Sequence, residues 1–229
     1  MNRDSNIYTI VYASVMVILV AFGLAFTSQS LKSYQKKNED IDKMKQILRS
    51  VRVQATAENA ESLYKELIKE SFLVDENGNK TEGDAFTTDV VKAFAGKKPL
   101  PVYVATVDGS TKYILCMQGA GLWGPLWGYL SIDDDKNTVF GSDFSHAGET
   151  PGLGAEIVTP AFSDQIKGKK LFNAEGEFKS IAIVKPGKTA EGQDYVDGIS
   201  GGTITSQGVN KMIFDSMSGY VKFLTSQKQ

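Results

Sequence analysis

The sequence has little of the two residues that most often build disulfides, metal centres and hydrolytic sites. Among its 229 residues, Cys116 is the only cysteine and His146 the only histidine. One cysteine excludes an intramolecular disulfide and a cysteine-based zinc or iron–sulfur site, and one histidine excludes a pair of histidine ligands. A Ser/His/Asp hydrolase would depend on His146 alone. We therefore predict no metal site.

An excess of charge of one sign is also lacking. The 25 Lys and Arg residues nearly balance the 27 Asp and Glu residues, so the net charge is −2. No basic stripe alternates with aromatic residues, and nucleic-acid binding is therefore not expected. Hydrophobic residues make up 41% and charged residues 23% of the chain, which is typical of a globular protein. The length suits one domain with accessory segments.

Charged residues are absent from 7–26, which read IYTIVYASVMVILVAFGLAF. At ~1.5 Å per residue such a helix spans about 30 Å, the thickness of a bilayer core. A cleaved signal peptide usually has a shorter apolar run, and Ala25-Phe26-Thr27 makes a poor cleavage site; a buried core helix is the other alternative. We predict a transmembrane helix over 7–26, with 1–6 as a short N-terminus. More Lys and Arg residues follow the span than precede it, which by itself would place the large domain in the cytoplasm.

The segment 27–99 is predicted to be a helical connector and the start of the soluble domain. From Ser28 to about Leu73 the pattern is helical, because apolar residues recur at spacings of three and four. The first patch consists of Ile41, Met44, Ile47, Leu48 and Val51, and the second of Leu63, Leu67 and Ile68. Residues 75–79 contain Asn-Gly and predict a turn.

From Leu100 onward the apolar period changes to two, which is typical of strands. Strands are predicted at 101–107, 112–117, 128–132, 138–140 and 178–184, with a turn at Asp108-Gly109 and a helix at 206–225. The prediction for 100–229 is an α+β domain, a mainly antiparallel sheet with packed helices.

The first of three glycine-rich loops, 119–129, holds four glycines and both tryptophans. Glycine allows a close approach of the backbone, and Leu122 with Trp123 offers an apolar surface for a planar ring. The alternative is a corner between strands whose tryptophans belong to the core.

The second loop, 145–156, reads SHAGETPGLGAE. Its Gly, Pro and polar residues indicate an ordered binding loop that includes Glu149, Thr150, Leu153 and Gly154. Glu149 has the chemistry of a general base or metal ligand, but with only Glu156 as a second carboxylate nearby it more often organises the loop. His146 is expected to be structural or exposed to solvent.

The third loop, 197–209, places glycines and hydroxyls immediately before the predicted C-terminal helix. Backbone N–H groups at a helix N-terminus attract phosphate. No Gly-Lys-Ser/Thr follows, which disfavours nucleotide hydrolysis. The alternative is that Thr205 or Ser206 simply caps the helix. A cap explains one hydroxyl but not the adjacent Gly201 and Gly202 with four hydroxyl residues in seven.

Together the three loops resemble the FMN-binding domain of bacterial redox-driven ion pumps. That family attaches FMN within the pattern Asp-x-x-Ser/Thr-Gly-Ala-Thr, where a flavin transferase moves FMN from FAD onto the last threonine. Position by position the resemblance assigns Asp197 as the acid, Ser200 as the first hydroxyl and Thr203 as the acceptor. Gly202 stands where the family usually has alanine. Since the missing methyl leaves the acceptor accessible, we expect attachment to survive.

Two proteins share this domain, the C subunit of the Na⁺-translocating NADH:quinone reductase and the G subunit of the ferredoxin-linked pump. Segments flanking the apolar span resemble the former. The resemblance implies an electron carrier in a membrane complex, with no catalytic side chain of its own and an extracytoplasmic flavin domain. The alternatives are the ferredoxin-linked protein, a flavoenzyme acting alone and a non-redox envelope binding module. The expected FMN-binding residues are Leu122, Trp123, Glu149, Thr150, Leu153, Gly154, Ser200, Gly201, Gly202, Thr203, Thr205 and Ser206.

Overall fold

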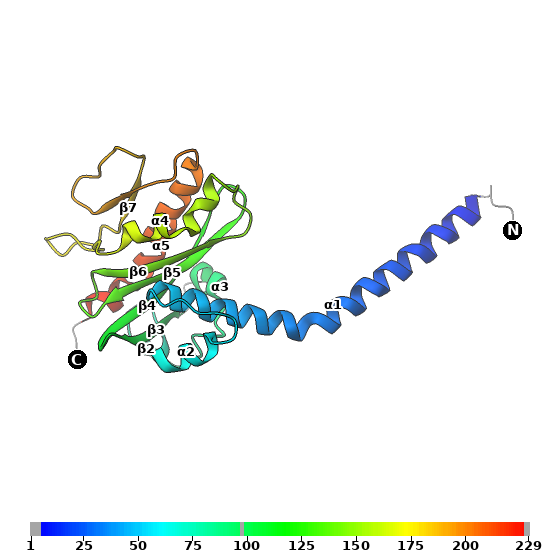
Figure 1. The fold of residues 1–229 in the computed structure, drawn as a ribbon, viewed down its shortest axis with the longest axis horizontal. Coiled ribbons are helices and arrows are strands. Elements are labelled where there is room, and N and C mark those ends of the chain that lie inside the picture. The colour runs from blue at the N-terminus through cyan, green and yellow to red at the C-terminus, as the bar shows by residue number, and fades with distance from the viewer. Residues whose placement is uncertain (1–5, 97–98, 227–229) are drawn as a thin grey trace. The chain divides into compact units, whose positions relative to one another are not determined.

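The computed structural model describes residues 6–96 and 99–226. Except for residue 6, the predicted N-terminus at 1–6 lies outside these residues. By its internal contacts the chain divides into two compact units, Met1–Lys43 and Met44–Gln229. The described residues of the first unit form the N-terminal part of α1, a helix that runs from Asn6 to Ser50 (Figure 1). Its apolar residues between 7 and 26 are exposed, except for the half-buried Tyr8, and the helix is long and apolar enough to cross a membrane by length and composition.

The second unit begins with the last turns of α1, followed by α2 (Ala60–Leu67), β1 (Ile68–Val74) and β2 (Lys80–Thr81). The prediction of helix from Ser28 to about Leu73 is therefore wrong at 51–59, between α1 and α2, and again after Leu67. Residues 68–74 instead pair with β3, with a register shift between Ile68 and Glu70, and sheet pairing overrides a weak local preference for helix. The turn predicted at 75–79 is confirmed, since it connects β1 to β2 and Gly78 has a φ of +83°.

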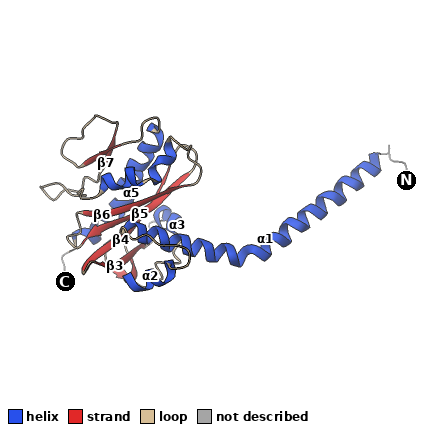
Figure 2. Cartoon of the chain, viewed as in Figure 1, coloured by secondary structure: helices blue, strands red, loops and turns tan. Residues whose placement is uncertain are grey.

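A six-stranded sheet forms the centre of the domain (Figure 2). After α3 (Val90–Gly96) come β3 (Leu100–Val107), β4 (Ser110–Ala120), β5 (Pro125–Asp133) and β6 (Val139–His146). The strand order is β2-β1-β3-β4-β5-β6, and every neighbouring pair is antiparallel. The predicted α+β class is thus confirmed, although β5 and β6 are longer than the sequence pattern indicated.

Each face of the sheet carries its own buried core, because successive side chains of a strand point to opposite faces. On one face, Val102, Leu115 and Met117 pack with residues of α5 (Thr203–Thr225) such as Val209 and Ile213. On the other face, Tyr103, Ile114 and Cys116 pack with Ile47 and Val51, from the end of α1 and the residue after it. The helix α5 lies along the first of these faces (Figure 1).

The chain between β6 and α5 consists of short elements. These are two 3₁₀ helices (Gly154–Val158 and Asp164–Ile166), α4 (Pro160–Ser163), β7 (Ala182–Val184) and β8 (Tyr195–Asp197). The strand predicted at 178–184 is correct only for its last three residues. Moreover, β7 pairs in parallel with β8 rather than joining the main sheet. The carboxyl ends of both strands therefore point the same way, towards the segment that enters α5.

Candidate functional site

The loop between β4 and β5 turns back on itself through a 2.8 Å hydrogen bond from the N–H of Gly121 to the carbonyl of Gly124. It presents Leu122 and Trp123 to solvent, with exposed fractions of 48% and 68%. The loop is a corner between strands, but the alternative of core tryptophans is wrong for Trp123. The other tryptophan, Trp127, is half-buried, and its indole N–H donates to Oε1 of Gln46 at 3.1 Å.

Glu149 in the second loop is almost completely buried and connects all three glycine-rich loops. Its Oε1 accepts the backbone N–H of Trp123 at 2.9 Å, and its Oε2 accepts the hydroxyl of Thr205 at 2.5 Å. Its own backbone N–H donates to Nδ1 of His146 at 3.1 Å. Glu149 is thus an organiser of the loops, and His146 has the structural role expected of it.

The electrostatics of Glu149 agree with this role. Desolvation raises the pKa of the carboxyl, but hydrogen bonds from the Thr205 hydroxyl and from the backbone N–H groups of Trp123 and Leu122 outweigh it. These hydrogen bonds hold the pKa of Glu149 below its ordinary value. A carboxylate kept ionised by such bonds acts as an acceptor, and it is poorly suited to donate a proton near neutral pH.

Two glycines allow this carboxylate to lie so close to the backbone. A Cβ on Gly121 would lie 2.4 Å from Oε1 of Glu149, and a Cβ on Gly154 would lie 2.3 Å from Oγ1 of Thr205. Real Cβ atoms do not approach so closely, so a larger residue at either position would push the loops apart. Packing around Glu149 and Thr205 therefore explains the glycines at 121 and 154.

The third loop ends at Thr203, where α5 begins three residues earlier than predicted. The N-cap residue is Gly202, and no side chain caps the helix. The alternative that Thr205 or Ser206 serves as the cap is therefore wrong. Both are buried inside the first turn, where Ser206 Oγ accepts the N–H of Ile199 at 2.9 Å. Thr203, in contrast, is exposed at the first position of the helix.

A cavity of about 430 Å³ lies beside Thr203. Its walls are the carboxyl end of β7 with the two residues after it, the loop between β8 and α5, and the start of that helix, and Ser200 and Gly201 belong to this lining. The N–H of Gly198, just after β8, donates to the carbonyl of Val184 at 2.7 Å and closes the base of the strand pair. The first N–H groups of a helix have no partner within it, and this cavity lies at that end of α5, beside the exposed hydroxyl of Thr203.

Two further predicted residues lie in the second loop. The carbonyl of Thr150 accepts the N–H groups of Leu153 and Ala155 at 3.1 Å each, and the Thr150 side chain is exposed. Leu153 is 43% exposed and lies against the third loop, because a Cβ on Gly201 would be 2.7 Å from its Cδ2 atom. The structure therefore places every predicted site residue in one assembly of three loops.

The cavity beside Thr203 is also lined by Lys185 and Pro186, two residues that were not predicted from the sequence. They follow the short strand β7, which the sequence pattern placed in the main sheet. The available signal was Pro186-Gly187, a dipeptide typical of a turn.

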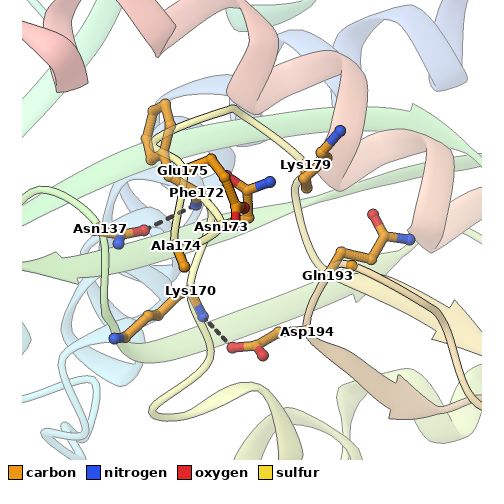
Figure 3. A pocket seen from close by; sticks show the side chains of 10 residues that line it. Asn137, Lys170, Phe172, Asn173, Ala174, Glu175, Lys179, Gln193 and Asp194 are labelled. Carbon is orange, nitrogen blue, oxygen red and sulfur yellow. Dashed lines mark hydrogen bonds between the residues drawn. The ribbon is translucent and has the colours of Figure 1, made fainter.

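A second hollow, of about 480 Å³, lies elsewhere in the domain (Figure 3). Its backbone donors already have side-chain partners: the N–H of Lys170 donates to Asp194 at 2.7 Å and that of Phe172 to Asn137 at 2.9 Å. None of the predicted site residues belongs to its lining. The smaller cavity at Thr203 is therefore the candidate site.

Known proteins resemble this chain over nearly its whole length. Residues 121–218 match the FMN-binding domain family. The chain is 31% identical to the C subunit of the Na(+)-translocating NADH-quinone reductase from Vibrio alginolyticus, and the match covers 91% of this chain and 89% of that protein. It belongs to the family of these C subunits. The corresponding protein of Haemophilus ducreyi is also 31% identical, with 91% and 88% covered.

Solved structures agree with this assignment. The crystal structure of the corresponding C subunit from Parabacteroides distasonis is 67% identical to this chain and has a TM-score of 0.84, covering 86% of this chain and 98% of that one. NqrC of Shewanella oneidensis is 23% identical with a TM-score of 0.68, covering 83% of this chain and all 100% of that chain, and supports the fold. The family supports FMN as the cofactor and a role within a multi-subunit oxidoreductase of the membrane.

Proposed function

We propose that this chain carries electrons within a Na⁺-translocating NADH:quinone reductase through an FMN attached to Thr203 by a phosphoester bond. The observation that supports Thr203 most directly is the contrast between neighbouring hydroxyls. Thr203 is exposed beside the cavity, whereas Thr205 and Ser206 are buried and engaged in hydrogen bonds with Glu149 and Ile199. Only the first of these three hydroxyls is accessible to another enzyme.

The surroundings of Thr203 suit the parts of FMN. The positive end of α5 favours the phosphate. The cavity of about 430 Å³ has room for the ribityl phosphate. Leu122, Trp123 and Leu153 are exposed apolar side chains on the adjoining loops, and such side chains bind planar rings. Both carboxylate oxygens of Glu149 already accept hydrogen bonds within the protein. Thr150 is therefore the residue of the second loop that is available for polar contacts with the flavin.

Attachment is a transfer from FAD that a flavin transferase catalyses. The Oγ1 atom of Thr203 forms a bond to the phosphorus of the FMN half, the hydroxyl loses its proton, and the pyrophosphate bond breaks with release of AMP. Nothing is oxidised or reduced in this step. The folded domain presents the acceptor on the first residue of a helix, so the transferase needs no unfolded substrate.

Once bound, the flavin supplies the one-electron chemistry, and the protein supplies orientation and electrostatics. Glu149 holds the loops in place, Gly201 and Gly154 permit their close packing, and the exposed apolar side chains exclude water from one side of the site. Because none of these side chains transfers a proton or forms a bond to a substrate, the chain alone is expected to have little turnover.

Flavin fluorescence in a denaturing gel tests the attachment. The full-length chain, co-expressed with a flavin transferase in membranes, should give a fluorescent band that Thr203→Val abolishes. Thr205→Ser is the matched control, because it keeps the hydroxyl that donates to Glu149, and its band should remain. A fluorescent band in Thr203→Val, or none in the wild type, would contradict the proposal.

We further propose that the flavin domain lies outside the cytoplasm, as in the topology implied by the family resemblance. The charge bias around the span favours the opposite side, but it is weak for long translocated domains. Cys116 is buried, so the exposed position of Lys188→Cys provides a selective thiol label. A maleimide that cannot cross the inner membrane should label this variant in cells with a permeabilised outer membrane. Labelling only after the inner membrane is broken would overturn the orientation.

A further inference from the structure

The chain after β7 forms a tight turn that fixes the position of one lysine. The N–H of Lys188 donates to the carbonyl of Lys185 at 2.9 Å, and Gly187 has a φ of +78°. With Pro186 at the second position, this is the pattern of a type II turn, whose third residue needs a positive φ. Lys185 is thus the first residue of a defined turn and does not belong to a free loop.

The two lysines of this turn differ in what they face. Lys185 lines the cavity beside Thr203, whereas Lys188 does not belong to its lining. Among the described residues that line the cavity, Lys185 carries the one charged side chain, and the others are apolar, hydroxyl-bearing or amide residues. No carboxylate in that lining neutralises it. The lining therefore contributes one positive charge, that of Lys185, beside the place where the proposed phosphoester lies.

We propose that Lys185 pairs with the phosphodiester anion that links FMN to Thr203. This inference rests on the proposed function. The phosphorus lies one bond from Oγ1 of Thr203, so the phosphate is confined to the mouth of this cavity. A phosphodiester keeps one negative charge in every redox state of the flavin. A lysine on a flexible stem suits such a compact anion, and it adds a full charge to the partial charge of the α5 N-terminus.

Lys185 could instead lie beside the flavin ring. The two positions differ in whether removal of the lysine changes the phosphorus environment or the midpoint potential. A lysine at the phosphate changes the phosphorus environment in all redox states. A lysine at the ring shifts the midpoint potential, because the ring gains charge on reduction. Lys188→Gln is the matched control, since it removes the same charge from the same turn without facing the cavity.

The experiment uses the full-length chain, loaded with FMN by a co-expressed transferase and purified in detergent. Lys185→Gln should move the ³¹P NMR resonance of the protein-bound phosphodiester, while Lys185→Arg and Lys188→Gln should keep it near its wild-type position. The initial rate of FMN incorporation should fall about two- to fivefold in Lys185→Gln, as expected for a partly exposed ion pair, and recover in Lys185→Arg.

Two results would overturn the pairing. One is a ³¹P resonance and an incorporation rate that are the same in Lys185→Gln and Lys188→Gln. The other is an unchanged resonance with a midpoint potential that shifts in Lys185→Gln only, which would place the lysine at the ring. A wild-type protein without protein-bound phosphorus would refute the proposed phosphoester at Thr203. The pairing with Lys185 would then be refuted with it.

Discussion

The hydroxyl of Thr205 donates a 2.5 Å hydrogen bond to Oε2 of Glu149, although 56 positions separate the two residues in the sequence. The other oxygen of the same carboxylate accepts the backbone N–H of Trp123. One buried side chain thus connects the strand corner, the second loop and the first turn of α5. The position of Thr203, two residues before Thr205, depends on this connection.

Removal of the carboxylate should loosen the whole assembly. In Glu149→Ala, the Thr205 hydroxyl and the Trp123 N–H lose their acceptor, and we expect a loss of about 2–4 kcal/mol in the free energy of unfolding. Glu156→Ala is the control, because Oε1 of Glu156 also accepts a loop N–H, from Gly152 at 3.0 Å, but at a half-exposed position. Thermal melting of the full-length chain in detergent measures both. Equal losses would show that Glu149 has no special role.

The contribution of Glu149 should depend on pH in a defined direction. Its pKa in the folded protein lies below the ordinary value of 4.5. Its ionised form therefore stabilises the fold above pH 4.5, and this contribution is lost as the pH falls through the lowered pKa. The difference in unfolding free energy between wild type and Glu149→Gln should be smaller at about pH 3 than at about pH 7. A difference that grows on acidification would contradict the direction of the shift.

The two adjacent glycines of the third loop should respond differently to alanine. Gly202 has a φ of −104°, and a Cβ there would lie 3.1 Å from side-chain atoms of Ile199 and 3.2 Å from the backbone N of Gly154, contacts that a shift of a few tenths of an ångström relieves. Gly201 has a φ of +77°, and its Cβ would lie 2.7 Å from Cδ2 of Leu153. Gly202→Ala should keep the fluorescent flavin band and cost less than about 1 kcal/mol, whereas Gly201→Ala should cost about 1–3 kcal/mol.

Melting temperatures and in-gel fluorescence of the two alanine variants provide the comparison. If Gly202→Ala alone lost flavin attachment, attachment in this chain would require glycine at position 202. The alanine that the family usually has there would then not be tolerated.

The end of α1 is part of the domain core, so the position of an N-terminal truncation should decide whether the domain folds. A chain that begins at Ser33 should fold, because residues 7–26 are exposed and contribute nothing to that core. A chain that begins at Val53 lacks Ile47, Leu48 and Val51, which are all 0% exposed. Removing several such side chains costs about 2–5 kcal/mol each. Near-UV circular dichroism should show fixed tertiary packing for the first chain only, and a native spectrum for the second would refute this.

The main features of the fold follow from patterns within the sequence. Alternation of apolar residues predicted β3 and β4, and the spacing of Val209, Ile213 and Met217 predicted α5. The uncharged run at 7–26 predicted the apolar helix. Each of these signals comes from residues that are close in the chain. Such local patterns show which side of a helix or strand is buried.

Other features depend on partners that are distant in the chain. Residues 68–74 become a strand because β3 lies beside them, and β7 pairs with β8 because the loop before α5 returns there. The glycines pointed to close packing, but only the structure shows that the packed group is the Glu149 carboxylate. The cavity and its lysine arise from that return of the chain, and the turn dipeptide Pro186-Gly187 was the one local pattern that pointed to them.

The place of Thr203 on a long, packed helix has a consequence for kinetics. From Val209 to Leu224, one face of α5 is buried in the domain, so the helix cannot swing relative to the sheet. A group bonded to Thr203 moves only by rotation about the bonds of the Thr203 side chain and of the group itself. For the proposed carrier, transfer distances to a redox partner should then form one narrow population. Electron transfer should follow a single exponential, whereas an anchor on a loose loop would give a spread of rates.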